Sequence, residues 1–289
     1  MFDIGLVVLF FAFLFGAAIG SFLNVLAFRL PEMIKQQDEK TAKEILNIID
    51  NEAVDIDVKQ QENILRPSKC PKCSNKLKYR HNIPILGWFL LKGKCYFCKV
   101  KISIQYPLVE LVSAISFCTI TYLYGVSWQA FALILLLCFF IPLFIIDLKH
   151  YILPDELTLP LIWIGLIINS YGIFTSLNSA VWGAVMGYLS LWSIYWIYKI
   201  FTAKEGFGYG DFKLLAAIGA WFGYQMLIYT IFASCIIGLI IAGLINLFGR
   251  RTNVIAFGPS IILASIFYLA TKDNLYIWYN HVMLIQSSL

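Results

Sequence analysis

Long apolar runs, separated by short polar turns, make up most of this chain. The first run is Ile4–Phe28, and seven more follow a polar segment: Tyr106–Tyr124, Ala130–Ile146, Leu157–Ile173, Ala180–Trp196, Phe212–Phe222, Met226–Phe248 and Val254–Ala270. A helix needs roughly 20 apolar residues to cross a bilayer. The pattern therefore predicts an all-α polytopic membrane protein with about eight transmembrane helices. Because the run at 212–222 is short, seven crossings are the alternative count.

The polar segment divides the chain. Its first half is rich in Lys, Glu, Gln and Asp, and its second half holds four cysteines. We expect a first transmembrane helix at 1–29, a cytoplasmic domain with the four cysteines at 30–105, a membrane-embedded domain at 106–271 and a C-terminal tail at 272–289.

Composition and charge support this organisation. Of 289 residues, 60% are hydrophobic and only 13% are charged, against about 25% charged in a soluble domain. The net charge is +5, and residues 29–101 hold 15 Lys and Arg against 9 Asp and Glu. Loops rich in Lys and Arg face the cytoplasm, and with eight crossings the pairs Lys149/His150, Lys199/Lys204 and Arg250/Arg251 fall on that side too. Topology explains the basic segment better than nucleic-acid binding, so we expect the bilayer, and no nucleic acid, as a partner.

The cysteines of the polar segment are spaced like metal ligands. Cys70 and Cys73 form one CxxC pair, and Cys95 and Cys98 form a second pair after 21 intervening residues. Two such pairs supply the four thiolates of a closed, tetrahedral zinc site, which is structural because no position is open to water. Two disulfides or a redox pair are the alternatives, and a cytoplasmic location disfavours stable disulfides. We predict structural zinc, whose binding contributes to the folding of this small segment.

Two aspartates stand at the ends of apolar runs. Asp147 ends the run 139–146, and Asp211 begins the run 212–222. Charges inside membrane spans are costly and usually functional, and the predicted topology places both carboxylates at the cytoplasmic level. Two carboxylates that share a proton can divide the work of catalysis, one accepting a proton from water and the other polarising a carbonyl group. This pairing predicts an aspartic endopeptidase.

The residues around the aspartates refine this prediction. Gly206, Gly208 and Gly210 permit an extended or turning backbone before Asp211, and we expect Gly208 and Gly210 to belong to a loop that pairs with substrate; a tight interhelical turn is the simpler interpretation. Asp155 reads as an acidic residue in the first turn of the next helix, and it is the reserve candidate for the first catalytic carboxylate.

Ordered motifs along nearly the whole chain resemble the type IV prepilin peptidases, membrane aspartic peptidases of the GxGD type. The matching segments are Gly20–Val25, Arg29–Pro31, Pro67–Cys73, His81–Ile85, Lys92–Cys95, Ile102–Ser103, Tyr106–Glu110, Ile146–Leu148, Leu153–Asp155, Gly208–Asp211 and Phe257–Pro259. The sequence has Lys92 and Lys94 where the family often has arginine.

The resemblance implies an enzyme of the bacterial inner membrane that cuts the leader from prepilins and pseudopilins at the cytoplasmic face, with Asp147 and Asp211 as the catalytic pair. It also implies N-methylation of the new N-terminus with S-adenosylmethionine, for which Glu110 is a candidate residue. No S-adenosylmethionine motif is visible in the residues themselves. The alternatives are a peptidase without methyltransferase activity and, in another class, a zinc-stabilised membrane carrier or scaffold whose aspartates form an ion path.

Overall fold

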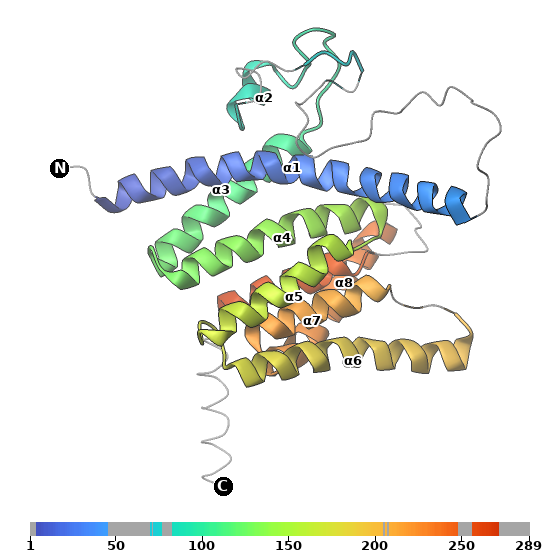
Figure 1. Cartoon of the computed structure of the whole chain (residues 1–289). Helices are drawn as coiled ribbons and strands as arrows, with labels where there is room; N and C mark the ends of the chain where they lie inside the picture. The colour runs from blue at the N-terminus through green and yellow to red at the C-terminus, as the bar shows by residue number, and fades with distance from the viewer. Residues whose placement is uncertain are drawn as a thin grey trace. The chain divides into compact units, whose positions relative to one another are not determined.

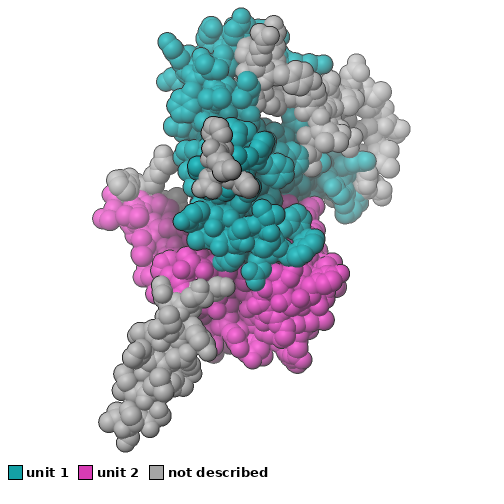
Figure 2. All heavy atoms as spheres, turned by 90° about the vertical axis from the view of Figure 1, so that its left-hand side faces the viewer, with its two compact units in different colours: residues 1–146 teal, residues 147–289 magenta. Residues whose placement is uncertain are grey.

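The computed structural model describes residues 4–45, 70, 72–76, 83–204, 206, 208–247 and 256–271. The chain divides into two compact units, Met1–Ile146 and Asp147–Leu289, drawn in teal and magenta in Figure 2. The expected C-terminal tail at 272–289, and residues 46–69 of the expected cytoplasmic domain, lie outside the described residues.

The described residues are almost entirely helical, as predicted. The helices are α1 (Ile4–Ile45), α2 (Leu86–Leu90), α3 (Gln105–Tyr124), α4 (Trp128–His150), α5 (Asp155–Ser170), α6 (Leu177–Thr202), α7 (Tyr209–Phe222), α8 (Gln225–Leu247) and a last helix, Gly258–Thr271 (Figure 1). Each of the eight apolar runs therefore contains a helix. Among the described residues, an isolated antiparallel β bridge joins Lys94 and Lys101.

Five of these helices are long and apolar enough to cross a bilayer. They lie at Gly5–Lys43, Gln105–Tyr124, Trp128–His150, Leu177–Thr202 and Gln225–Ile245. The other apolar helices are shorter, and α7, with 14 residues, is about 21 Å long at ~1.5 Å per residue. The polytopic class is confirmed, and the short run at 212–222 is a short helix.

In the first unit, α1 packs along α3 (Figure 1). The close approach depends on two glycines of α1. A Cβ atom at Gly16 would lie 2.8 Å from Ala114 Cα, and one at Gly20 would lie 2.8 Å from Glu110 Cα. Small residues at such positions let the backbones of membrane helices come together and gain dispersion energy. The register of α1 against α3 is thereby set at Gly20 and Glu110.

In the second unit, α7 packs against both α5 and α6 (Figure 1). Its residues from Asp211 to Trp221 are buried apart from Lys213, as expected for a helix that is apolar on all sides. Gly219 and Gly183 cross in direct contact, since a Cβ atom at Gly219 would lie 2.1 Å from Gly183 O. This crossing holds α7 against α6.

The C-terminal end of α7 is held by a side chain from α5. Asn169 Nδ2 donates to the carbonyl oxygens of Ala220 and Trp221 at 2.8 and 2.7 Å, and its Oδ1 accepts from the backbone N–H groups of Phe174 and Thr175 at 3.1 and 3.2 Å. The last carbonyls of a helix lack partners within it, so Asn169 satisfies two of them. The axial position of α7, and hence of Asp211 at its other end, follows from this anchor.

Candidate active site and metal centre

Asp147 lies in the last turn of α4, and its side chain is buried with 5% exposed. Its Oδ2 atom accepts a hydrogen bond of 2.9 Å from the backbone N–H of Gly258. Gly258 begins the last helix, so an N–H group that has no partner within that helix points at the carboxylate. The last helix therefore positions the Asp147 side chain.

Asp211 lies in the first turn of α7 and is 8% exposed. Its backbone N–H donates to Gly208 O at 3.1 Å, and Gly208 is the extended N-cap residue of the helix. The positive end of a helix dipole favours a carboxylate at this position. The carboxylates of Asp211 and Asp147 are close enough to interact electrostatically. The second unit thus brings together the two aspartates selected from the sequence.

Three glycines shape the space around this pair, two of them through contacts with Leu153. A Cβ atom at Gly210 would lie 2.6 Å from Leu153 Cβ, and one at Gly258 would lie 3.2 Å from both methyl groups of Leu153 and 2.6 Å from Asp147 Oδ2. One at Gly208 would lie 3.6 Å from Asp211 Oδ2, an ordinary contact. Gly210 and Gly258 are therefore required by packing, whereas Gly208 leaves open backbone beside a carboxylate.

Gly258 was part of a motif in the sequence, but no role could be assigned to it. The motif Phe257–Pro259 is 111 residues from Asp147, and nothing in its local pattern points to a particular carboxylate. Only the folded chain brings its N–H to Asp147.

Asp155, the reserve carboxylate, has a different environment. It is the first residue of α5 and forms an ion pair with Lys213, whose Nζ lies 2.6 and 2.7 Å from its two carboxylate oxygens. The side chain of Asp155 is 53% exposed. Lys213 is on α7, two residues after Asp211, so this ion pair joins the first turn of α5 to α7 near its start.

The four cysteines come together in the first unit. Their sulfur atoms all lie within 4.8 Å of one another. The two pairs have the same backbone form: Ser74 N donates to Cys70 O and Lys99 N to Cys95 O at 2.9 and 3.0 Å. Ser74 and Lys99 both have positive φ, at 55° and 58°. Each pair is thus a tight turn that directs two thiols to one point.

These distances fit a tetrahedral zinc ion. Cys70 Sγ and Cys98 Sγ are 3.7 Å apart, and thiolates at ~2.3 Å from a tetrahedral zinc ion stand about 3.8 Å from one another. Hydrogen bonds from the backbone of Cys73 and Lys72 lower the pKa of the Cys70 thiol to about 6. A backbone hydrogen bond from Val100 lowers the pKa of the Cys98 thiol, but burial and the three neighbouring thiols raise it overall to about 11. A bound metal ion takes both cysteines as thiolates. All four cysteines are free thiols, so the cluster meets the requirements of a zinc site.

Glu110, the methyltransferase candidate, is buried on α3 with 7% exposed. Its Oε2 accepts a hydrogen bond of 2.6 Å from the backbone N–H of Ile85. Glu110 therefore belongs to the first unit and joins α3 to the turn before α2.

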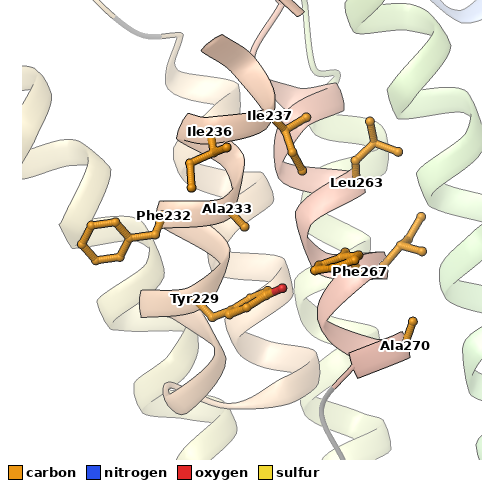
Figure 3. Close-up of a pocket in the computed structure, with 9 residues that line it drawn as sticks. Tyr229, Phe232, Ala233, Ile236, Ile237, Leu263, Phe267 and Ala270 are labelled. Carbon is orange, nitrogen blue, oxygen red and sulfur yellow. The ribbon is translucent and has the colours of Figure 1, made fainter. Parts of the chain in front are cut away.

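An apolar groove lies between α8 and the last helix (Figure 3). Tyr229 stacks on Phe267 across it, with ring centroids 6.5 Å apart, and the rest of its lining is aliphatic or aromatic. Apart from the Tyr229 hydroxyl, it offers no titratable group for acid–base chemistry. The groove fits the acyl-chain environment expected beside membrane helices.

Comparison with known proteins matches the chain to two family models. The model of the "Bacterial Peptidase A24 N-terminal domain" matches residues 14–124, which include the four cysteines and Glu110, and that of the "Type IV leader peptidase family" matches residues 134–243, which include Asp147 and Asp211. No solved structure matches the chain.

Several relatives are similar along almost the entire length. Proteins named "Prepilin leader peptidase/N-methyltransferase" from Stutzerimonas stutzeri and Pseudomonas aeruginosa are each 43% identical, covering 91% of this chain and 91% and 90% of their own lengths. The protein of that name from Neisseria gonorrhoeae is 42% identical, with 90% of both chains covered. This chain belongs to the type IV leader peptidase family.

Proposed function

We propose that this protein cleaves the leader peptides of prepilins and pseudopilins with Asp147 and Asp211 and then methylates the new N-terminus. The observation that supports the peptidase most directly is the approach of two buried carboxylates within the family's peptidase segment. The names of the relatives supply the substrate class and the second activity.

Hydrolysis needs one carboxylate that accepts a proton from water and one that donates a hydrogen bond to the scissile carbonyl. Two buried carboxylates that interact electrostatically share a proton more readily than they both ionise. A backbone N–H can only donate, so Asp147 Oδ2 is an acceptor toward Gly258. The shared proton is therefore on Asp147 Oδ1 or on Asp211.

The open backbone before Asp211 suggests how the substrate binds. Gly208 is extended, with φ −79° and ψ 145°, and a Cβ atom there would meet only the Asp211 carboxylate. An extended backbone without a side chain offers N–H and C=O groups for pairing with an extended peptide. We therefore propose that Gly208, the last residue before α7, pairs with the substrate, and that Gly210, in the first turn of α7, adjoins this segment and accommodates Leu153.

Charge supports placing the site at the cytoplasmic face of the bacterial inner membrane. Lys149 and His150 lie in the last turn of α4, next to Asp147, and Lys199 lies in the last turn of α6, close in sequence to the start of α7. Basic residues at helix ends favour the cytoplasmic side. We propose the same side for the segment 30–105, with 106–271 as the peptidase domain.

The cysteine cluster is proposed to bind one structural zinc ion through Cys70, Cys73, Cys95 and Cys98. A closed shell of four thiolates stabilises the fold around it and leaves no position for a reacting water. S-adenosylmethionine is the proposed methyl donor, and when bound it supplies the methyl group. Glu110 is the residue that we assign to the methyl-transfer activity, because it is a buried carboxylate in the first unit.

The peptidase assignment can be tested with three isosteric variants of the full chain in lipid nanodiscs and a synthetic prepilin. Asp147→Asn and Asp211→Asn should each lower leader cleavage by at least about 10³-fold, because each removes a group needed for proton transfer. Asp155→Asn is the matched control. It breaks only the exposed ion pair to Lys213, worth about 0–1 kcal/mol, and should cleave within about fivefold of wild type.

Normal cleavage by Asp147→Asn together with loss of cleavage in Asp155→Asn would exchange the roles of the two residues and refute the assignment. The thermal unfolding temperature of each variant, measured in the same nanodiscs, separates lost chemistry from lost folding. Transfer of a labelled methyl group to the cleaved substrate tests the second activity independently.

A further inference from the structure

A band of polar side chains lies between α1 and α3 in the first unit, and none of its members is one of the two aspartates or the four thiols. It consists of Ser21 and Asn24 on α1 and of Glu110 and Ser113 on α3, facing one another where Gly20 brings the helices together. Asn24, Glu110 and Ser113 are 2%, 7% and 0% exposed. Buried polar groups in membrane helices are costly and usually functional, so this band calls for a ligand or a structural partner.

The hydrogen bonds within the band leave acceptors unused. Asn24 Nδ2 donates to Tyr106 O at 3.0 Å and to Gly20 O at 3.3 Å, but Asn24 Oδ1 and Ser113 Oγ have no partner among the described residues. A buried polar atom without a partner costs about 1–3 kcal/mol. Together with the Glu110 carboxylate, the unused oxygen of Asn24 forms a site rich in acceptors. The group that would complete it is a cation with several N–H donors.

The turn at Ile85 covers the Glu110 carboxylate in a strained conformation. Ile85 has φ 63° and ψ −60°, and Leu86 N donates to Pro84 O at 2.6 Å across it, which makes a γ-turn with positive φ. This form is rare and strained, most of all for a β-branched residue. The backbone N–H of Ile85 donates a hydrogen bond to Glu110 Oε2 and thus lies where an ammonium group would bind. Because the turn stores strain of about 1–3 kcal/mol, a ligand can displace it at reduced cost.

We propose that Glu110, Asn24 and Ser113 bind the α-ammonium group of the cleaved substrate, the new N-terminus that peptide hydrolysis releases. This inference rests on the methyl-transfer part of the proposed function. An α-amine must lose a proton before it can react, and the Glu110 carboxylate accepts it. The amine nitrogen then bonds to the methyl carbon of the sulfonium donor as the carbon–sulfur bond breaks, and the electron pair of the broken bond remains on sulfur.

Binding can be measured without turnover. The probes are a synthetic peptide with the N-terminal sequence of a cleaved substrate and its N-acetylated twin, which has no charge at the N-terminus. The zinc-loaded full chain in nanodiscs should bind the free amine at least about tenfold more tightly, as a charge-assisted hydrogen bond to a buried carboxylate implies. In Glu110→Gln, which keeps an oxygen for the Ile85 N–H, this preference should fall to within about twofold.

Ser113→Ala separates a ligand site from a structural role. Removing a buried hydroxyl without a partner should leave the unfolding temperature unchanged or higher, whereas the preference for the free amine should fall at least threefold; an unchanged preference would remove Ser113 from the proposed site. Cys118→Ala is the matched control on the same helix pair: it removes the contact of Cys118 Sγ with Leu9 O and should keep the full preference. Asp211→Asn should also keep it, while abolishing leader cleavage.

A wild-type protein without preference for the free amine, or a Glu110→Gln protein that retains the full preference, would overturn the proposal. So would a Glu110→Gln protein that loses only the binding of S-adenosylhomocysteine, because the cluster would then hold the methyl donor. If the wild type prefers the amine but transfers no labelled methyl group, the amine site stands and the proposed methyltransferase activity is wrong.

Discussion

The contact between Gly258 and Asp147 gives a sharp test of how the site is positioned. Gly258→Ala would add a Cβ atom 2.6 Å from Asp147 Oδ2, well inside van der Waals contact. The atom that must move is the far end of the aspartate side chain, which can rotate away. The substitution should therefore displace the carboxylate and break its 2.9 Å hydrogen bond while the helices remain in place.

The expected loss of activity follows from that hydrogen bond. A hydrogen bond to a charged group contributes about 1.5–3 kcal/mol. If this stabilisation is lost in the transition state, each ~1.36 kcal/mol lowers the rate tenfold. The kcat for leader cleavage should fall by about 10- to 150-fold. Stability should fall modestly, because the added Cβ atom also lies 3.2 Å from both methyl groups of Leu153, which must shift slightly to accommodate it.

The assay is leader cleavage at saturating synthetic prepilin, with the unfolding temperature measured on the same nanodisc sample. Gly243→Ala is the matched control, since Gly243 lies on α8 and a Cβ atom there would meet nothing within 4 Å. It should retain wild-type kcat. Full activity in Gly258→Ala at unchanged stability would refute the argument that this N–H positions Asp147.

Two further predictions concern the metal and the helix packing. The purified protein should contain about one zinc per chain. Cys70→Ser should lose it, whereas Cys235→Ser, at an exposed cysteine of α8, should keep it by metal analysis. Gly219→Ala should lower the free energy of unfolding by about 3 kcal/mol, the upper range for overpacking, because its Cβ atom would lie 2.1 Å from the backbone oxygen of Gly183. Denaturant unfolding beside Gly243→Ala checks this, and equal stability of the two variants would contradict the packing argument.

Much of the architecture could be predicted from local patterns. Apolar runs of the right length correspond to helices because hydrophobic residues and internally paired backbones are what a bilayer requires. The unusually short run at 212–222 is a 14-residue helix, α7, so even this exception was visible in the sequence. The CxxC pairs predicted a cluster, since two residues between cysteines let a tight turn direct both thiols to one side.

Other features depend on contacts between distant segments. Nothing in the sequence near Asp155 indicates that it pairs with Lys213, 58 residues away, and the apolar run around Asp147 does not reveal that Gly258 donates to it. Glu110 stood out only through the family resemblance, and its partner Ile85 follows from a turn that no propensity would favour. These pairings arise when packed helices bring specific atoms into register. A shift of one helix by one residue would break the pairing that it carries.

The sequence by itself determined the membrane class, the helical segments, the thiol cluster and the family, because each depends on the spacing or order of residues along the chain. Only the tertiary structure decided which groups surround each carboxylate: a backbone N–H at Asp147, a lysine at Asp155 and a strained turn at Glu110. The physical reason is that the behaviour of a carboxylate depends on burial and on neighbours a few ångströms away, and those neighbours come from other helices.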